Sequence, residues 1–498
     1  MTKGDIVRVH RRQFVVGPRP HIPTPDWLFL ELSPGLVLSA DPDLRIDSAT
    51  DRNGIRWWLL GAAVDTDAER DTPLAEIGRR NTDAIEALYQ GWSGRWVLIG
   101  RGELHADATA MLACYHGTSP DGETWASSSP VLIRRILGLP EQADNPQTSD
   151  GAGWRPSANA TATGAVKGIS WFPPPHSGTA GVRRLLPSQI LDLRRATLRP
   201  RPLASSIDDA LDDDDLLEAL AQAIGVAVEK VANLEASDEA TLLLSGGRDS
   251  RLLLSLARSR GLNLRTYTRV HWRASLADRL LPPKLAGMAG YPHRAVCQKG
   301  EIPGRRQVIL DHAGYAVSWL SAEEFMDGGS DPLKGVAIAG LSAALGRDRF
   351  LSDAHPQDLK GAWIAKRFDE NASDLIEAFD AWLAWRRAHP DPVADMSDCF
   401  FLEQRTGGRK GAKEQICDLL RFERVPPLNS TYIFGLVLKL SPELQRKGDW
   451  MTLLIKASMP ELLREPINPP DSHFGKISGR LASFLAYGRV RRRHLSTG

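Results

Sequence analysis

The sequence predicts an α/β protein in two parts, and two observations support this. Between Trp27 and Gly100, short apolar or alternating runs are separated by Pro, Gly, Asp and Asn, which is typical of antiparallel strands. After residue 207, apolar strand-length runs alternate with helical spacing, which favours a doubly wound parallel sheet. A chain of 498 residues is also too long for one compact core.

The composition excludes several classes of protein. Hydrophobic residues make up 42% and charged residues 25% of the chain, which is ordinary for a globular protein. A formal net charge of +1 gives no overall reason to bind nucleic acid or a membrane surface. The four cysteines form no Cys-x-x-Cys pair, which argues against a zinc site or a disulfide framework. With no signal peptide and no transmembrane stretch, we expect a cytoplasmic protein.

In the first part, the expected strands are Trp27–Leu32, Leu36–Ala40, Arg56–Val64 and Arg95–Gly100, and the expected helices are Pro73–Tyr89 and Val131–Leu137. Residues 138–165 are rich in Gly, Pro, Ser and Asn and predict a loop. Short hairpins over 181–193 close this part, and residues 199–209 suit a linker.

The second part opens on an acidic run from Asp208 to Asp215. Such a run suggests a metal site, but it directly precedes Leu216–Leu234, a strongly periodic helix. Carboxylates at a helix N-terminus are stabilised by the helix dipole, so we favour a capping role.

The stretch 240–256 carries the strongest functional signal. The apolar run Thr241–Leu244 predicts a buried strand, Ser245-Gly246-Gly247 predicts a turn, and Leu252–Leu256 predicts a helix with an apolar face. In such a turn, backbone N–H groups and the positive end of the helix dipole point at one spot. Asp249 adds a carboxylate for Mg²⁺. The stretch therefore predicts a phosphate-binding loop.

Further strands are expected at Leu262–Thr268 and His293–Val296, with a helix between them from about Pro282 to Gly290 that has its prolines in the first turn. Ligands of parallel sheets bind at the carboxyl ends of the strands. That places Tyr267 and Thr268 near the ligand and Asp278 at the mouth of the site, although Asp278 also suits a solvated loop.

The loop resembles the PP-loop of the ATP pyrophosphatases, with the pattern Ser-Gly-Gly-x-Asp-Ser at Ser245 to Ser250. The order of elements resembles the asparagine synthetase family over nearly the whole chain. That family has an N-terminal-nucleophile glutaminase domain, an αββα sandwich, before the synthetase domain. The resemblance implies a glutaminase-like domain over 1–200 and an ATP pyrophosphatase domain with a helical C-terminal part over 207–498.

Three departures from the family pattern stand out. Position 2 is Thr2 rather than the cysteine nucleophile, so we expect no glutaminase activity. The stretch Gly335–Arg347 supplies Gly340 and Arg347, but Ala344 stands in place of the Mg²⁺-binding acid. The alternative alignment on Asp327–Asp331 lacks a preceding buried strand. No lysine stands near Pro466, where synthetases present a catalytic one, and Lys476 is either its replacement or a surface lysine.

The resemblance implies an ATP-dependent, AMP-forming carbon–nitrogen ligase. It would adenylate a carboxylate and pass the acyl group to an amine of a peptide or small molecule. β-Lactam synthetases and lasso-peptide cyclases of this family close a ring in this way, and relatives in surface-glycan clusters amidate sugar acids. The alternative is a pseudoenzyme that binds nucleotide or a partner. A thiolase or tRNA-modifying enzyme is a more distant third, because no cysteine pair or basic domain supports it.

The residues and the resemblance together assign the sites. Contacts to ATP fall on Leu244, Ser245, Gly246, Gly247, Arg248, Asp249, Ser250, Arg251, Tyr267, Thr268, Asp278 and Gly340. Catalytic roles fall on Asp249, Lys476 and Arg347, with Asp249 as the Mg²⁺ ligand. The sequence names neither the substrate nor the oligomeric state, and the basic tail from Arg489 to His494 suits either an anionic partner or solvent.

Overall fold

The computed structural model describes residues 8–140, 168–235, 240–270, 275–297, 305–314, 333–342, 344–347, 350–470 and 473. The predicted loop at 138–165, apart from its first three residues, Thr2, Lys476 and the basic tail lie outside these residues. Among the described helices, none combines the length and the apolar character needed to cross a lipid bilayer.

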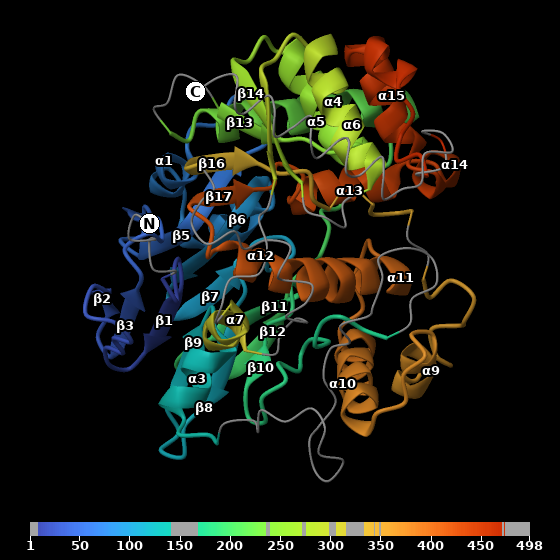
Figure 1. The fold of residues 1–498 in the computed structure, drawn as a ribbon. Helices are drawn as coiled ribbons and strands as arrows, with labels where there is room; N and C mark the ends of the chain where they lie inside the picture. Colours follow the sequence, from blue (N-terminus) through green and yellow to red (C-terminus); the bar gives the residue numbers. More distant parts are fainter. Residues whose placement is uncertain are drawn as a thin grey trace.

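Two six-stranded antiparallel sheets form the first part of the chain (Figure 1). Their strand orders are β10-β8-β9-β1-β3-β2 and β12-β11-β7-β6-β5-β4. The strands are β1 (Phe14–Gly17), β2 (Leu28–Ser33), β3 (Leu36–Ala40), β4 (Ile46–Thr50), β5 (Arg56–Asp65), β6 (Trp92–Gly100), β7 (Glu103–Ala106), β8 (Tyr115–Thr118), β9 (Thr124–Ser127), β10 (Arg183–Arg184), β11 (Gln189–Asp192) and β12 (Thr197–Pro200).

The two sheets pack face to face, because inward side chains of both meet in one apolar cluster. Phe14 and Leu38 come from one sheet, and Leu60 and Val97 from the other. The outer face of the second sheet packs on α1 (Pro73–Gly78) and α2 (Ile85–Tyr89). The outer face of the first sheet packs on α3 (Pro130–Ile136) and α7 (Arg305–Ala313). The layers therefore run helix, sheet, sheet, helix.

The four strands expected between Trp27 and Gly100 are confirmed as β2, β3, β5 and β6, with ends shifted by up to three residues. The single helix expected over Pro73–Tyr89 is wrong. Helix α1 ends at Gly78, and a short 3₁₀ turn (Thr82–Ala84) precedes α2. The intervening Gly78 and Asn81 favour turn conformations over a continuous helix.

The second part contains a five-stranded sheet with the order β15-β14-β13-β16-β17. All four strand pairs are parallel, which confirms the expected parallel sheet. Its strands are β13 (Ala240–Leu243), β14 (Leu264–Val270), β15 (His293–Cys297), β16 (Gly335–Ile338) and β17 (Phe422–Val425). The sequence did not predict β17 as a strand.

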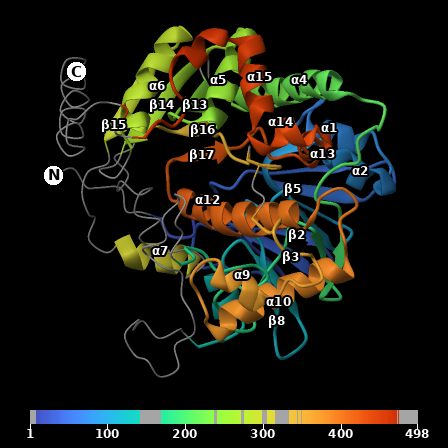
Figure 2. The same ribbon diagram turned by 90° about the vertical axis from the view of Figure 1, so that its right-hand side faces the viewer.

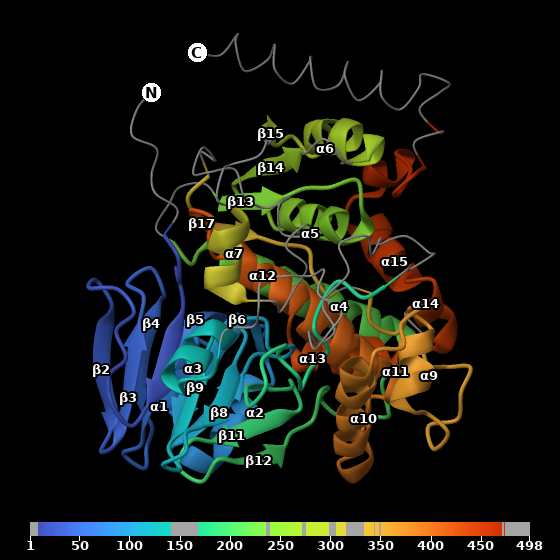
Figure 3. The same ribbon diagram turned by 60° about the horizontal axis from the view of Figure 1, so that its bottom comes forward.

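The other described helices are α4 (Asp213–Ala232), α5 (Arg248–Ser259), α6 (Leu276–Met288), α9 (Gly361–Lys366), α10 (Ser373–Ala388), α11 (Met396–Cys399), α12 (Gly411–Cys417), α13 (Thr431–Lys439), α14 (Pro442–Arg446) and α15 (Asp449–Ser458). Of these, α4, α5, α6 and α15 lie together beside the parallel sheet in Figure 1. A π-helical segment, Phe400–Lys410, connects α11 to α12, and a 3₁₀ turn spans Pro460–Arg464. Figures 2 and 3 show α12 between the parallel sheet and the antiparallel sheets.

The acidic run caps α4, as expected. The Asp212 side chain accepts hydrogen bonds from the backbone N–H groups of Asp214 and Asp215, each at 3.0 Å, and the Asp215 carboxylate accepts one from the Asp212 N–H at 3.3 Å. Asp213 accepts from the Ser441 N–H at 2.8 Å. Asp212 and Asp215 therefore cap the start of α4, and Asp213 ties this start to Ser441.

The expected start of α6 near Pro282 is wrong. The helix begins at Leu276, after Ser275, whose hydroxyl accepts from the Asp278 N–H at 3.1 Å. Pro282 and Pro283 therefore lie inside the helix rather than in its first turn. A serine N-cap is the strongest local start signal, and here it outweighs the prolines.

Buried polar contacts join the two parts of the chain. The Arg95 guanidinium donates to both carboxylate oxygens of Asp418, with Nη2 to Oδ2 at 2.6 Å, and both side chains are buried. The Asn429 carboxamide donates to Asp107 at 2.8 Å and to the Gly94 carbonyl at 2.7 Å. One apolar cluster also takes residues from both parts.

Candidate functional site

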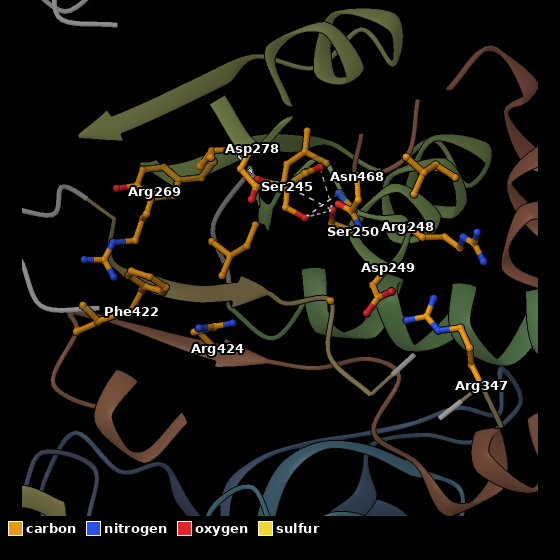
Figure 4. Close-up of a pocket in the computed structure, with 18 residues that line it drawn as sticks. Ser245, Arg248, Asp249, Ser250, Arg269, Asp278, Arg347, Phe422, Arg424 and Asn468 are labelled. Atoms are coloured by element: carbon orange, nitrogen blue, oxygen red, sulfur yellow. Dashed lines mark hydrogen bonds between the residues drawn. The ribbon is translucent and has the colours of Figure 1, made fainter. Parts of the chain in front are cut away.

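A cavity of about 740 Å³ opens at the carboxyl ends of the parallel strands, beside the start of α5 (Figure 4). The predicted residues that line it are Leu244, Ser245, Gly247, Arg248, Asp249, Ser250, Tyr267, Thr268, Asp278, Gly340 and Arg347. They come from four separate segments of the chain. The structure thus brings together most of the residues that the sequence analysis selected.

The loop after β13 is held by its own serines. The Ser250 hydroxyl accepts from the Ser245 N–H at 3.1 Å and lies 3.0 Å from the Ser245 hydroxyl. The Ser245 hydroxyl in turn accepts from the Gly247 N–H at 3.2 Å. At the next strand, the Thr268 hydroxyl donates to the Leu244 carbonyl at 2.6 Å. The loop is therefore preorganised around the start of α5.

Asp278 fixes the middle of this loop. Its Oδ1 accepts from the Gly246 N–H at 2.9 Å, and its Oδ2 accepts from the Ser275 hydroxyl at 2.9 Å. A Cβ at position 246 would lie 3.1 Å from the backbone of Ala277. Asp278 lines the cavity, yet both of its oxygens serve to hold the loop against α6. Gly246 itself does not line the cavity.

The start of α5 is open toward the cavity. Its N-cap is Gly247, which has no side chain to cap the first N–H groups of the helix. Gly340, at the end of β16, approaches it closely, because a Cβ there would lie 3.0 Å from the Ser250 nitrogen. The N–H groups and the helix dipole therefore favour an anion at this place.

In the part of the chain that the structure describes, the charged side chains that line the cavity are four arginines, at 248, 269, 347 and 424, and two aspartates, Asp249 and Asp278. Arg248 donates to the Gly448 carbonyl at 2.8 Å. Burial, and then the nearby charge of Arg347, lower the pKa of Arg248. Figure 4 shows Arg347 pointing toward Asp249. The excess of positive charge suits an anionic ligand.

Asp249 is the carboxylate available for a metal. Among the described residues, no group of three or more His, Cys, Asp and Glu side chains could hold a metal ion. Mg²⁺ typically binds through one or two carboxylates together with substrate phosphates. Asp249, one residue into α5 and beside the anion-binding loop, fits that pattern.

Arg251 does not line the cavity. It is fully buried, and its guanidinium donates to the carbonyls of Leu462, Glu465 and Pro466 at 2.6 to 2.9 Å and to the Gly246 carbonyl at 3.4 Å. Arg251 therefore joins the loop to the C-terminal segment, and we expect it not to contact a ligand in the cavity.

The cavity also takes residues that the sequence analysis did not select as site residues: Leu243, Arg269, Leu420, Phe422, Arg424, Ile467 and Asn468. Phe422 packs edge-on against Tyr267, with ring centroids 6.5 Å apart. Figure 4 shows Arg269, Phe422 and Arg424 at the end away from Asp249. The segment Phe422-Glu423-Arg424-Val425 has two charged residues between its apolar ends, so its pattern carries no clear signal for a buried strand.

Lys410, at the end of the π-helical segment, is a further cation near the loop. Its Nζ lies 5.6 Å from the centroid of the Phe401 ring, and it makes no hydrogen bond or ion pair with a described residue. Burial lowers the pKa of Lys410, and the nearby charge of Asp249 partly opposes this. π-Helical turns often accompany functional sites.

The structure describes two of the positions at which the sequence departs from the asparagine synthetase pattern. Ala344 is partly buried and packs against the main apolar cluster. The segment near Pro466 brings Asn468, and no lysine, to the cavity among the described residues.

Comparison of the chain with protein-family models finds no match, and comparison with curated protein sequences finds none either.

Proposed function

We propose that the chain is an ATP-dependent, AMP-forming carbon–nitrogen ligase. In this proposal it adenylates a carboxylate and transfers the acyl group to an amine of a peptide or small molecule. The observation that carries the proposal is the Ser245–Ser250 loop, preorganised at the start of α5 and open to a cavity with an excess of arginine. The layered sheets before Pro200 support a glutaminase-like domain over 1–200, and the parallel sheet supports an ATP pyrophosphatase domain over 207–498.

Each part of the cavity has a task in this chemistry. The open N–H groups of α5, with Arg248 and Arg347, would stabilise the negative charge that develops on the departing pyrophosphate. Asp249 would hold Mg²⁺, which shields the phosphates when bound. Tyr267 and Phe422 would face the adenine end. In this proposal the amine comes from the substrate or from ammonia, as in a lactam or macrolactam closure.

The second candidate is a pseudoenzyme that binds nucleotide or a partner without turnover. The apolar packing of Ala344 favours it, because the carboxylate expected at that position is absent. The segment near Pro466, where the family pattern has a lysine, brings Asn468 and no described lysine to the cavity, which points the same way.

ATP–pyrophosphate exchange separates the two candidates. The wild-type chain, Asp249→Asn and the exposed control Asp358→Asn would be assayed with Mg²⁺ over peptides, β-amino acids and uronic acids. We expect substrate-dependent exchange that falls by about 100-fold in Asp249→Asn and persists in the control. Asp249-dependent ATP binding without exchange would favour the pseudoenzyme. Failure of the wild-type chain to bind ATP would contradict both.

A further inference from the structure

The C-terminal segment from Leu462 to Asn468 lies against the phosphate-binding loop. Arg251, on α5, clamps it through the carbonyls of Leu462, Glu465 and Pro466 at 2.8, 2.6 and 2.9 Å. The same guanidinium reaches the Gly246 carbonyl at 3.4 Å. One buried cation therefore holds the loop and the segment together, although they are more than 200 residues apart in the sequence.

Asn468 is the residue that this clamp presents to the cavity. Its N–H donates to the Gly246 carbonyl at 3.2 Å, and its backbone has a φ of 42°. That left-handed conformation is disfavoured for a residue followed by proline, here Pro469, and such conformations persist where surrounding contacts hold them. The conformation places the carboxamide over the loop.

The Asn468 side chain lies beside the N-cap of α5. A Cβ on Gly247 would be 3.5 Å from its Oδ1 and 3.7 Å from its Nδ2. The carboxamide lines the cavity and makes no hydrogen bond with a described residue. Figure 4 shows it next to Ser245 and Ser250. Its polar atoms are therefore available to a ligand.

The loop itself has fewer free donors than its sequence suggests. The N–H groups of Ser245, Gly246 and Gly247 already bond to Ser250, Asp278 and Ser245 side chains. An anion there would rely on the first N–H groups of α5 and on side-chain donors. A carboxamide N–H₂ group beside Gly247 supplies two donors.

We propose that the Asn468 carboxamide binds the phosphate chain of ATP and of pyrophosphate, and that Arg251 is the residue that positions it. This inference rests on the proposed ATP-dependent function and assigns a phosphate contact to the C-terminal segment. AMP lacks the β- and γ-phosphates of ATP. A contact of Asn468 with these phosphates would therefore distinguish ATP and pyrophosphate from AMP. The arrangement couples the segment to the loop, since Gly246 accepts bonds from both residues.

Calorimetric titration of the full chain with ATP, pyrophosphate and AMP, each with Mg²⁺, tests the assignment. We expect Asn468→Ala to weaken ATP and pyrophosphate binding about tenfold, the loss of a hydrogen bond to a charged group. Asn468→Asp should weaken both further, because a carboxylate repels phosphate. AMP affinity should stay within about twofold of the wild-type value. Asn468 is exposed, so neither change should prevent folding.

Arg251→Gln, with the exposed Arg258→Gln on the same helix as its control, tests the positioning role. Arg251→Gln should weaken pyrophosphate binding, and adding Asn468→Ala to it should cost little more, since the carboxamide is already displaced. Wild-type affinity in both Asn468 variants, alongside Asp249-dependent ATP binding, would overturn this inference and leave the proposed function standing. Additive losses in the double variant would overturn the positioning role. Absence of any binding by the wild-type chain would remove both proposals.

Discussion

Gly340 lies where the end of β16 meets the start of α5. A Cβ at this position would be 3.0 Å from the Ser250 nitrogen and 3.2 Å from the Asp249 Cβ. Both neighbours belong to the helix start that faces the cavity, and backbone atoms yield less easily than the end of a long side chain. Gly287, inside α6, would instead place a Cβ in open space.

We expect Gly340→Ala to push the start of α5 out of place. It should weaken ATP binding by about tenfold and lower the free energy of unfolding by about 1–3 kcal/mol through overpacking. Titration with ATP and urea denaturation measure the two effects. Gly287→Ala is the matched control and should leave ATP binding unchanged and raise stability by about 0.5–1 kcal/mol. Equal ATP affinity in both variants would show that the helix start does not touch the ligand.

At the scale of elements, α4 shows how a charged run can be structural. The helix starts with a reciprocal pair, in which the Asp212 carboxylate accepts from the Asp215 N–H and the Asp215 carboxylate accepts from the Asp212 N–H. Asp214 lies in the same first turn, but its exposed side chain does not take part in the cap. Substitution of Asp212 therefore tests the cap, and substitution of Asp214 tests the effect of a negative charge near the helix N-terminus.

Replacing Asp212 by Ala should lower the free energy of unfolding by about 1 kcal/mol, because a helix N–H loses its partner. Asp214→Ala should cost about 0.5 kcal/mol or less. Urea denaturation of both variants measures the difference. ATP binding should be unchanged in both, since neither residue lines the cavity. Equal losses of stability would mean that the helix dipole, and not the cap, dominates.

At the scale of the whole molecule, a buried histidine pair helps to join the two parts. His312 Nδ1 accepts from the His10 N–H at 3.1 Å, so its Nε2 carries the proton that it donates to the Gln415 carbonyl at 2.8 Å. His10 Nδ1 lies 2.8 Å from the Gln13 side-chain oxygen. Burial lowers the pKa of both imidazoles from 6.5 to about 4. Both are therefore neutral in the folded protein near pH 6.

This predicts a loss of stability in mild acid. Below pH 6.5 the unfolded chain takes up protons on His10 and His312, whereas the folded protein does so only near pH 4. The free energy of unfolding should therefore fall as the pH drops from 6.5 to 4, by at most about 1.4 kcal/mol per pH unit for each histidine. Urea denaturation at several pH values measures this slope.

His10→Gln should reduce that slope, because it removes one of the histidines whose pKa burial lowers, while others such as His116 and His293 remain. His355→Gln, at an exposed position, is the control and should keep the wild-type dependence. A slope that is unchanged in His10→Gln would show that other groups cause the acid sensitivity.

Local chemistry was sufficient for much of the fold. The apolar run before Ser245, the glycine turn and the leucine-rich helix after it predicted β13, the loop and α5, and the structure has all three. Strand-length runs such as Leu36–Ala40 were predicted for the same reason, since neighbouring residues decide turns and strand propensity. The prolines of α6 were misleading, because the N-cap Ser275, seven residues before Pro282, decided where the helix begins.

By itself, the sequence determined the parallel-sheet part, the Ser-Gly-Gly loop and the expectation that Tyr267, Asp278, Gly340 and Arg347 gather at the strand ends. Only the tertiary structure decided which distant side chains complete the cavity. Phe422 enters because β17 pairs with β16, and Asn468 enters because Arg251 fixes its segment. Arg251 directly follows the loop motif but does not line the cavity. The reason is physical: local propensities set elements along the chain, whereas contacts across hundreds of residues form only when those elements pack.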